Sequence, residues 1–474
     1  MRRKALVPLK LVVGAALPII CAACQHVPPA PIDPAANGAR IAARSLADPL
    51  VHDALARHDL PLSADQTWSL DQLTLAAWTL RTDLAVARSE VDAARAATGV
   101  ASQRRNPSVT TTTEKVFDPD VDSPWVIGAA LALNIEPGGK REIRRDRALA
   151  QEQALEWQFG EALWSARAEV RKALLDLALA RELAALDSEQ AQLARAFLAW
   201  VMARFEHGAA TISERLAAVR AVSESESRRE LDNAALATAA ARLAAAIGVA
   251  PSEVAGVRPA APLLPTLPAI AAEELNTARD LALVNRLDVR RALAEYEIAE
   301  QDLRAAVASQ YPDLTLAPGY LVDQADHKIT LGLDLPVPLF HDASAAIRRA
   351  IADRAVAAAK FDEVQAAAFA AIEIGFAQYQ SSRNALEAVL QAERDAADAV
   401  TSLERRIAAG GANRGELLAG QLALIGLRRN VLEARRAALE AATLLENGIE
   451  RPLFPASSLE PAGAIRELLV EVPQ

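Results

Sequence analysis

The chain has 474 residues and a formal net charge of −10 at pH 7, and 52% of its residues are hydrophobic although only 4% are aromatic. Much of the hydrophobic fraction is alanine, which favours helix and close helix packing over a thick core of large side chains. The acidic balance, which becomes −14 without residues 1–23, argues against nucleic-acid binding, because phosphates need a basic footprint.

Residues 1–23 have the pattern of a signal peptide. A basic start at residues 2–4 is followed by a short apolar stretch and two alanines, the small residues that signal peptidase needs. Cys24 comes next and resembles the acylated first residue of a bacterial lipoprotein. Cys21 stands where that motif usually has leucine, so cleavage without lipid attachment remains an alternative. No later stretch approaches 18 uninterrupted apolar residues, so a membrane crossing would have to use strands.

Proline positions predict where the helices lie, since proline costs ~3 kcal/mol or more inside a helix. Prolines cluster at residues 28–34, and we expect residues 24–63 to form an extended tail. The proline-free window between Pro61 and Pro107 predicts a long helix.

The most informative window is 140–206, which predicts one uninterrupted helix. Its apolar residues recur every 3.7 residues on average, as in a straight helix. They are Leu155, Phe159, Leu163, Ala166, Val170, Leu174 and Leu177. At 1.5 Å per residue the helix would be ~100 Å long, about the width of a periplasm. Gly208 ends it, and Thr211 or Ser213 caps a return helix that runs to about Ala246.

The chain repeats this organisation about 200 residues later. Arg81-Thr82-Asp83-Leu84 returns as Arg286-Leu287-Asp288-Val289, and Gly208 with Glu214 returns as Gly410 with Glu416. The second hairpin is predicted at 343–409 and 416–446. The predicted organisation is therefore a first repeat over 64–257, a proline-rich linker over 258–270, a second repeat over 271–455 and a C-terminal tail over 456–474.

Each long helix is preceded by two predicted strands. Residues 125–135 and 328–335 alternate cleanly between apolar and polar or small side chains, and 108–117 and 313–321 are their predicted hairpin partners. Such strands suit the wall of a barrel in lipid, although a small soluble sheet with one buried face remains an alternative. Because four strands cannot close a barrel, we expect three chains to pool twelve. The predicted fold class is mainly α with a small β part.

With these features the chain resembles the TolC-like family of outer-membrane efflux ducts. The resemblance covers residues 65–455 and rests on the duplication, the order of elements and the hairpin turn that runs from Arg204 to Gly208. The strand-to-helix corner Gly138-Gly139-Lys140-Arg141 is similar to the branch that serves heavy-metal cation pumps, whereas Pro338-Leu339-Phe340 is common across the family. The resemblance implies a homotrimer with a 12-stranded outer-membrane barrel and a periplasmic helical barrel. It also implies a periplasmic membrane-fusion adaptor and a proton-driven inner-membrane pump.

The resemblance places the adaptor contact at the two hairpin tips. The predicted contact residues are Arg204, Gly208, Ala209, Ala210 and Thr211 in the first tip, and Gly410, Gly411, Ala412 and Asn413 in the second. Charged residues near the tips are candidates for a gate, although solvated helix-end charges would look the same. These candidates are Glu206, Glu214, Glu404, Arg405 and Glu416.

The sequence contains no catalytic constellation, and its six histidines show no metal-ligand spacing. We therefore expect neither an enzyme nor a resident metal or cofactor. Two alternatives stay open. The duct could serve drugs, other small molecules or type I secretion, or the protein could be a non-conducting periplasmic scaffold of coiled helices anchored by lipid.

Overall fold

A computed structural model of the chain describes residues 27–62, 67–117, 124–260, 267–324, 326–338 and 342–453. The predicted signal peptide, Cys24 and the tail over 456–474 lie outside these residues. The chain forms two compact units, Met1–Arg44 and Ser45–Gln474. Among the described residues, none of the helices is both long and apolar enough to cross a membrane.

The tail predicted to be extended contains two helices. In the first unit, Asp33 caps α2 (Pro34–Ala42), and in the second unit Asp48 caps α3 (Pro49–Arg57). Each aspartate side chain accepts hydrogen bonds from backbone N–H groups of the first turn, and a proline occupies the first helical position, where it needs no partner. The expectation of an extended tail over 24–63 is therefore wrong at these residues, because the Asp-Pro pairs start helices.

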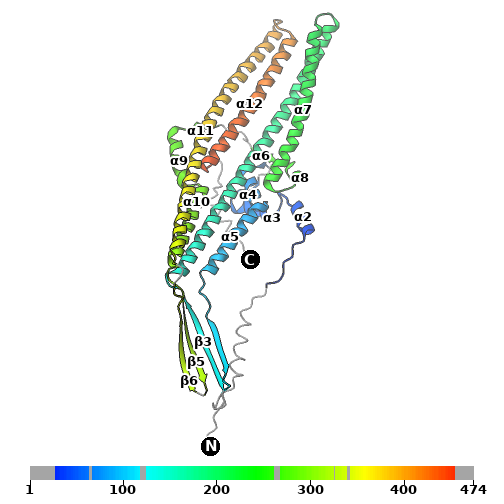
Figure 1. The fold of residues 1–474 in the computed structure, drawn as a ribbon. Coiled ribbons are helices and arrows are strands. Elements are labelled where there is room, and N and C mark those ends of the chain that lie inside the picture. Colours follow the sequence, from blue (N-terminus) through cyan, green and yellow to red (C-terminus); the bar gives the residue numbers. More distant parts are fainter. Residues whose placement is uncertain are drawn as a thin grey trace. The chain divides into compact units, whose positions relative to one another are not determined.

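The second unit runs twice through the same order of elements (Figure 1). The first copy contains α4 (Leu70–Leu80), α5 (Thr82–Ala101), β2 (Ser108–Lys115), β3 (Trp125–Ile135), α6 (Lys140–Glu206) and α7 (Ile212–Ile247). The second contains α9 (Ala272–Asn285), α10 (Leu287–Ala308), β5 (Leu314–Asp323), β6 (Asp326–Asp334), α11 (Ser344–Ala408) and α12 (Arg414–Ile449). Between them lie the short helix α8 (Pro251–Val254) and the strand β4 (Arg258–Pro259), which pairs in parallel with β1 (Thr67–Trp68). The predicted long hairpins and strands are confirmed to within a few residues.

The single long helix expected before each pair of strands is instead two helices. The backbone is extended at Arg81, between α4 and α5, and at Arg286, between α9 and α10. Both breaks fall at the first residue of the repeated Arg-x-Asp motif. The breaks were not predictable from local pattern, because no proline or glycine marks them.

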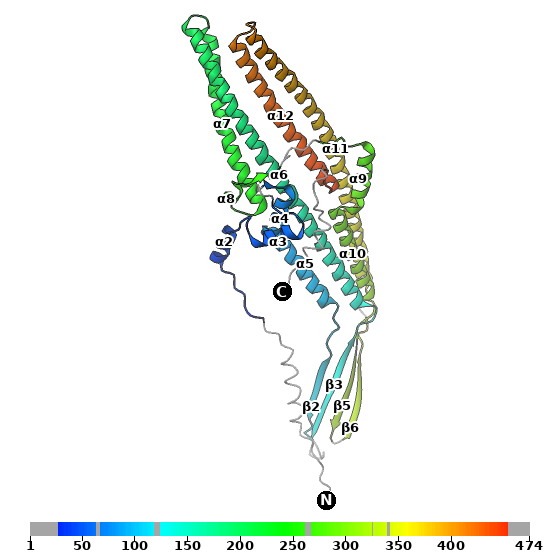
Figure 2. The ribbon, with the colours of Figure 1, turned by 180° about the vertical axis from the view of Figure 1, so that it is seen from behind.

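The four long strands form one antiparallel sheet in the order β2-β3-β5-β6. Its central pair, β3 with β5, joins the two copies, with Val126 opposite Asp323 and Ile135 opposite Leu314. The outer edges of β2 and β6 have no strand beside them among the described residues. In both views of the second unit the sheet lies at one end of the long helices and the hairpin turns at the other (Figures 1 and 2).

The two faces of this sheet differ in polarity. Residues that lie directly opposite in an antiparallel pair share a face. One face is mainly apolar and includes Ile127, Leu131, Leu133, Tyr320, Ile329, Leu331 and Leu333. These side chains are exposed, and Ile329 retains 89% of its accessible surface. The other face carries mainly small and polar residues, apart from Val126 and Leu321. It is crowded at Gly319, where a Cβ would lie only 2.7 Å from the Thr330 hydroxyl.

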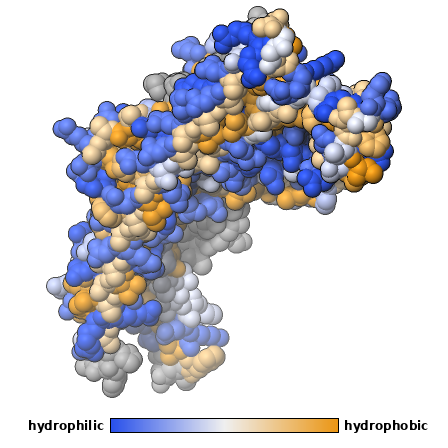
Figure 3. All heavy atoms as spheres, turned by 90° about the horizontal axis from the view of Figure 1, so that it is seen from above, coloured by the Kyte–Doolittle hydropathy of each residue, from blue (hydrophilic) through white to orange (hydrophobic). Residues whose placement is uncertain are grey.

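The largest core cluster lies among the helices, around the middle of α6. The predicted apolar stripe of α6 is buried from Phe159 to Leu177 and packs against α4 and α7 in a cluster that α3 joins, with Leu155 partly buried. Trp78 fixes α4 to α6, because its indole N–H donates to the carbonyl of Leu163 at 3.0 Å. Viewed from above, polar and apolar side chains alternate in patches over the surface (Figure 3).

Candidate functional site

The first hairpin tip is closed by Arg204. Its guanidinium donates to the carbonyl of Ala209, lies 3.8 Å from the Glu214 carboxylate and stacks 4.7 Å above the Trp200 ring. Gly208 adopts a left-handed φ of 72°, which suits glycine. Thr211 caps α7 by accepting from the Glu214 N–H at 3.2 Å. The Thr211 N–H donates back at 2.6 Å and lowers the pKa of Glu214.

The second tip has the same three features at equivalent positions: an arginine bound to a backbone carbonyl, a left-handed glycine and a helix cap. Arg406 donates to the carbonyl of Gly411 at 3.0 Å, and Gly410 has a φ of 74°. Asn413 caps α12 by accepting from the Glu416 N–H at 3.0 Å, and its amide donates to the Glu416 carboxylate at 2.7 Å. Both turns are therefore built by an arginine at the end of one helix and a capping pair at the start of the next.

The structure brings the predicted tip residues together in two separate turns. Glu214 and Glu416, which were candidates for a gate, serve as partners of the helix caps. Glu206, Glu404 and Arg405 are exposed on the last turns of α6 and α11, and their role in a gate stays a prediction. The arginine that closes the second tip is Arg406 and not its neighbour Arg405.

A seam that the sequence did not predict forms where α6 of the first hairpin lies along α12 of the second. Near the tips the Trp200 ring lies directly on the backbone of Gly415, so closely that a Cβ built on this glycine would overlap three ring atoms. Phe197 stacks against the same indole with ring centroids 5.9 Å apart. Because residue 415 is a glycine, the Trp200 ring of α6 can lie against the backbone of α12.

Midway along the seam Arg429 of α12 binds two aspartates of the first hairpin. It pairs with Asp187 of α6, and its other terminal nitrogen lies 2.8 Å from Asp232 of α7. Burial, followed by a hydrogen bond with Asp232, raises the pKa of Asp187 to about 6. Nearby, Arg436 of α12 pairs with Asp176 of α6 at 2.9 Å. The arginine holds two carboxylates that would otherwise repel each other.

At the base of the seam the ion pair is fully buried. Glu446 of α12 is 1% exposed and pairs with Arg171, while Arg167 lies 3.8 Å away and is 2% exposed. Burial lowers the pKa of Arg167 despite the nearby glutamate. Buried charges of this kind are tolerated only when they are paired.

The repeated Arg-x-Asp motif anchors the return helix of each hairpin. Arg81 donates to the carbonyl of Ala246 at the end of α7 at 3.3 Å, while Asp83 holds its guanidinium with two hydrogen bonds. Arg286 does the same at the end of α12, where it donates to the carbonyls of Asn447 and Gly448 and is held by Asp288. These carbonyls have no partner within their own helices, so the arginines cap them.

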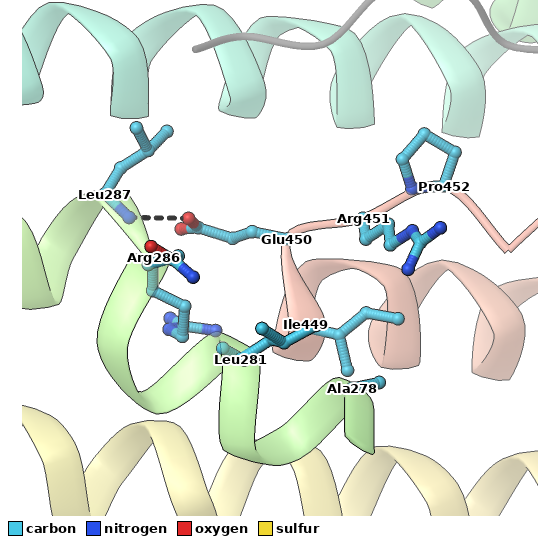
Figure 4. A pocket seen from close by; sticks show the side chains of 10 residues that line it. Ala278, Leu281, Arg286, Leu287, Ile449, Glu450, Arg451 and Pro452 are labelled. Carbon is cyan, nitrogen blue, oxygen red and sulfur yellow. Dashed lines mark hydrogen bonds between the residues drawn. The ribbon is translucent and has the colours of Figure 1, made fainter. Parts of the chain in front are cut away.

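Beside the second anchor lies a pocket of about 210 Å³ (Figure 4). Glu450 points across it and accepts a hydrogen bond from the Leu287 N–H at 2.7 Å. Burial raises the pKa of Glu450 to about 7, although this hydrogen bond and Arg286 oppose the shift. Glu450 also has a left-handed φ of 49°, whereas the equivalent residue of the first copy is Gly248, with a φ of 90°.

Among the described residues, no group of three or more histidine, cysteine or acidic side chains could hold a metal ion. The strand-to-helix corner at residues 138–141 has a structural role. Gly138 and Gly139 both have positive φ, and Lys140 donates to the carbonyl of Tyr311 and to Asp313, each at 2.6 Å. The corner thereby links the start of α6 to the second copy.

A family model described as outer membrane efflux protein matches residues 76–249 and 278–448, well over half of the chain. The chain belongs to this family. The two matched segments fall in the two copies, and the family resemblance expected from the sequence is thereby confirmed. Members of this family are channels and not enzymes.

Solved structures share the fold of the efflux family at low sequence identity. A membrane protein from Pseudomonas aeruginosa is 19% identical, with a TM-score of 0.65 over 84% of this chain and 92% of that one. VceC from Vibrio cholerae is 18% identical, with a TM-score of 0.64 over 81% and 97%. The CmeC channel from Campylobacter jejuni is 14% identical, with a TM-score of 0.65 over 94% and 97%. No curated protein shows significant sequence similarity to the chain.

Proposed function

We propose that the protein is the passive exit duct of a tripartite efflux pump. Three copies would pool their sheets into a 12-stranded barrel in the bacterial outer membrane, and their long helices would form a tunnel into the periplasm. The observation that carries this proposal is the four-stranded sheet with an exposed apolar face, whose edges at β2 and β6 have no neighbouring strand within the part of the chain that the structure describes.

An open sheet edge is costly in lipid, since each unpaired backbone group costs several kcal/mol there. The antiparallel order β2-β3-β5-β6 continues without interruption when β6 of one copy lies beside β2 of the next. Twelve strands close such a wall around a bore, whereas eight would leave an interior filled by side chains. The apolar face would then meet lipid, and the small and polar face would line the duct.

The helical hairpins would carry the duct towards a periplasmic adaptor and a proton-driven inner-membrane pump. The two tips are suited to this contact, because an arginine and a capping pair hold each turn in one conformation. Cys24 would anchor the mature chain to the membrane through a lipid. Metabolic labelling with palmitate tests that anchor, since Cys24→Ser should abolish the label if the cysteine is acylated.

For the substrate we propose heavy-metal cations, on the strength of the corner Gly138-Gly139-Lys140-Arg141. Deletion of the gene should then sensitise cells to zinc, cobalt or cadmium. Sensitivity only to drugs or detergents would reject the metal assignment and leave the duct intact.

Planar bilayers test the duct itself. Purified, folded trimers should produce discrete ion-conducting events, and a variant that lacks residues 108–135 should produce none. Folded protein that stays water-soluble after removal of the lipid and never conducts would favour the periplasmic scaffold instead.

A further inference from the structure

The helix before the Arg-x-Asp motif is buried in the first copy and partly exposed in the second. α4 ends just before Arg81 and α9 ends just before Arg286, so their residues correspond at an offset of 205. In α4 the face formed by Leu73, Ala76 and Leu80 is buried, and α3 packs against this helix. The equivalent residues of α9 are Ala278, Leu281 and Asn285.

These three residues of α9 line the pocket beside Glu450 (Figure 4). Leu281 is 51% exposed, and Val284 on the same helix is 65% exposed. Ile449, at the end of α12, and Pro452 complete the apolar lining. The second copy therefore has an apolar groove where the first copy has a covered helix face.

The chain that precedes α9 does not supply a second copy of α3. By the same offset of 205 residues, α3 corresponds to residues 254–262. Val254 and Val257 from that stretch are buried in the core cluster of the first copy. These residues are therefore committed to the first copy and cannot also cover α9.

The chain that follows α12 is better placed to fill the groove. Arg451 and Pro452 already line the pocket. Leu453 packs on the core cluster to which α9 contributes Leu275 and Ala282. The residues that come next in the sequence, 454–474, thus begin at the edge of the groove.

The sequence of this segment has the features that start and define α3. Asp48 and Pro49 begin α3, which buries Val51 and Leu55 on one face. Glu460-Pro461 has the same order of an acidic residue and a proline, and proline favours the first helical position. Apolar residues then recur at the spacing of one helix face, before another proline at position 473. They are Ile465, Leu468, Leu469 and Val472.

We propose that residues 461–472 form an amphipathic helix that packs along α9, as α3 packs along α4, and closes the pocket beside Glu450. Residues 454–460 would connect this helix to Leu453 and can reach about 24 Å when extended. α9 has 14 residues and is about 21 Å long, so the connection is long enough to place the helix anywhere along it. The inference concerns a single chain and does not depend on the proposed trimer.

Hydrogen exchange of the folded, full-length chain tests this contact. Leu468→Ser combined with Leu469→Ser removes the apolar face of the segment. The amides of α9 should then exchange about tenfold faster or more, since burial of one leucine is worth at least that change in local opening. Arg466→Ser combined with Glu467→Ser, on the polar face of the same segment, is the matched control and should leave α9 unchanged.

The amides of α4 are an internal reference, because α3 covers that helix in every variant. They should stay protected in both double variants, which shows that the fold is intact. Unchanged exchange of α9 in the leucine variant would overturn the inference. Equal acceleration of α9 in the leucine variant and in the control would overturn it too.

Disulfide formation identifies what occupies the groove. In a chain whose natural cysteines are replaced by serine, Leu281→Cys paired with Leu468→Cys or with Leu469→Cys should form a bond within one chain. Mass spectrometry of monomer-sized protein detects the linked peptides. Leu281→Cys with Glu467→Cys is the control and should not form the bond, because Glu467 lies on the polar face.

Bonds only between different chains would assign the groove to a second copy and would overturn the inference. Absence of any bond from either leucine position in folded protein would overturn it as well. Folded protein that never conducts in planar bilayers would contradict the proposed duct and would leave these results unaffected. Failure of the inference and failure of the proposed function are therefore distinguishable.

Discussion

Glu450 shows how one residue distinguishes two otherwise equivalent sites. Both copies anchor the end of their return helix with the arginine of the Arg-x-Asp motif, but the carboxylate beside that arginine differs: Arg81 pairs with the exposed Glu169, whereas Arg286 lies beside the partly buried Glu450. The charged groups that face Glu450 are Arg286, Asp288 and Glu161. The base of the second hairpin is therefore sensitive to pH.

The raised pKa of Glu450 predicts how stability changes with pH. The folded protein holds a proton on this carboxyl up to about pH 7, whereas the unfolded chain releases it near the ordinary value of 4.5. The contribution of Glu450 to the unfolding free energy is thus largest below pH 4.5 and declines as the pH rises to 7.

Glu450→Gln removes this dependence and keeps an acceptor for the Leu287 N–H. Thermal unfolding at pH 5 and pH 8 should show the variant gaining stability, relative to the parent protein, only at the higher pH. An identical pH profile for both proteins would contradict the shift.

The buried glutamate at the base of the seam predicts a large loss of stability. Glu446→Leu leaves Arg167 and Arg171 without their shared carboxylate in a dry site and should cost ~3–5 kcal/mol. Glu440→Leu is the matched control, because Glu440 pairs with Arg436 on the surface of the same helix, where a pair contributes ~0–1 kcal/mol. Denaturant titration in detergent measures both losses. Equal losses of unfolding free energy in the two variants would contradict the prediction that the buried pair stabilises the fold more than the exposed pair.

At the scale of elements, local signals located the long hairpins and the strands. Proline-free windows, glycines at the turns and alternation of apolar residues act over a few residues, so the sequence alone reveals them. The helix breaks at Arg81 and Arg286 were missed because each depends on carbonyls more than 160 residues away. The two tail helices were not predicted because a proline cluster is compatible both with extended chain and with a helix start.

The seam was missed for a different reason. The seam residues lie inside regular helices: Trp200 in α6, and Gly415 and Arg429 in α12. Their residue types fit the helical pattern of the sequence, so the pattern does not indicate a contact between the two helices. Only a comparison of the two copies distinguishes them, since Ser402, Ser213 and Ser227 occupy the equivalent positions. A difference between copies of a repeat was the one signal in the sequence that could have located the seam.

The capping pairs at the tips predict the local stability of these turns. Thr211→Ala removes the acceptor for the Glu214 N–H, and loss of such a cap costs ~1 kcal/mol, or roughly a fivefold change in local opening. Hydrogen exchange of the first amides of α7 should therefore quicken by about that factor. Thr238→Ala, inside the same helix, should leave those amides unchanged. Unchanged exchange in Thr211→Ala would mean that contacts other than the cap hold the tip.

At the scale of the whole molecule, the duplication gives each chain four strands and two hairpins. The sheet presents one apolar face and two edges without neighbours among the described residues, and the family comparison identifies an efflux channel. Within one copy, β2 and β6 are separated by two strands, or ~14 Å. A disulfide needs Cα atoms within ~7 Å, so these edges cannot be joined inside a single chain.

A disulfide between the two edges tests the proposed trimer most directly. In sequence, Asn134 of β3 corresponds to Asp334 of β6 (offset 200), and Thr110 of β2 corresponds to Thr315 of β5 (offset 205, as for Pro107 and Pro312). Asn134 lies opposite Thr315 in the pairing of β3 with β5. If β6 meets β2 of the next copy in the same register, Asp334 lies opposite Thr110. Thr110→Cys combined with Asp334→Cys should then yield covalent products of two and three chains in outer-membrane fractions, and nothing larger. Failure to cross-link in folded protein, or products that stop at two chains or extend beyond three, would contradict the closed twelve-stranded wall.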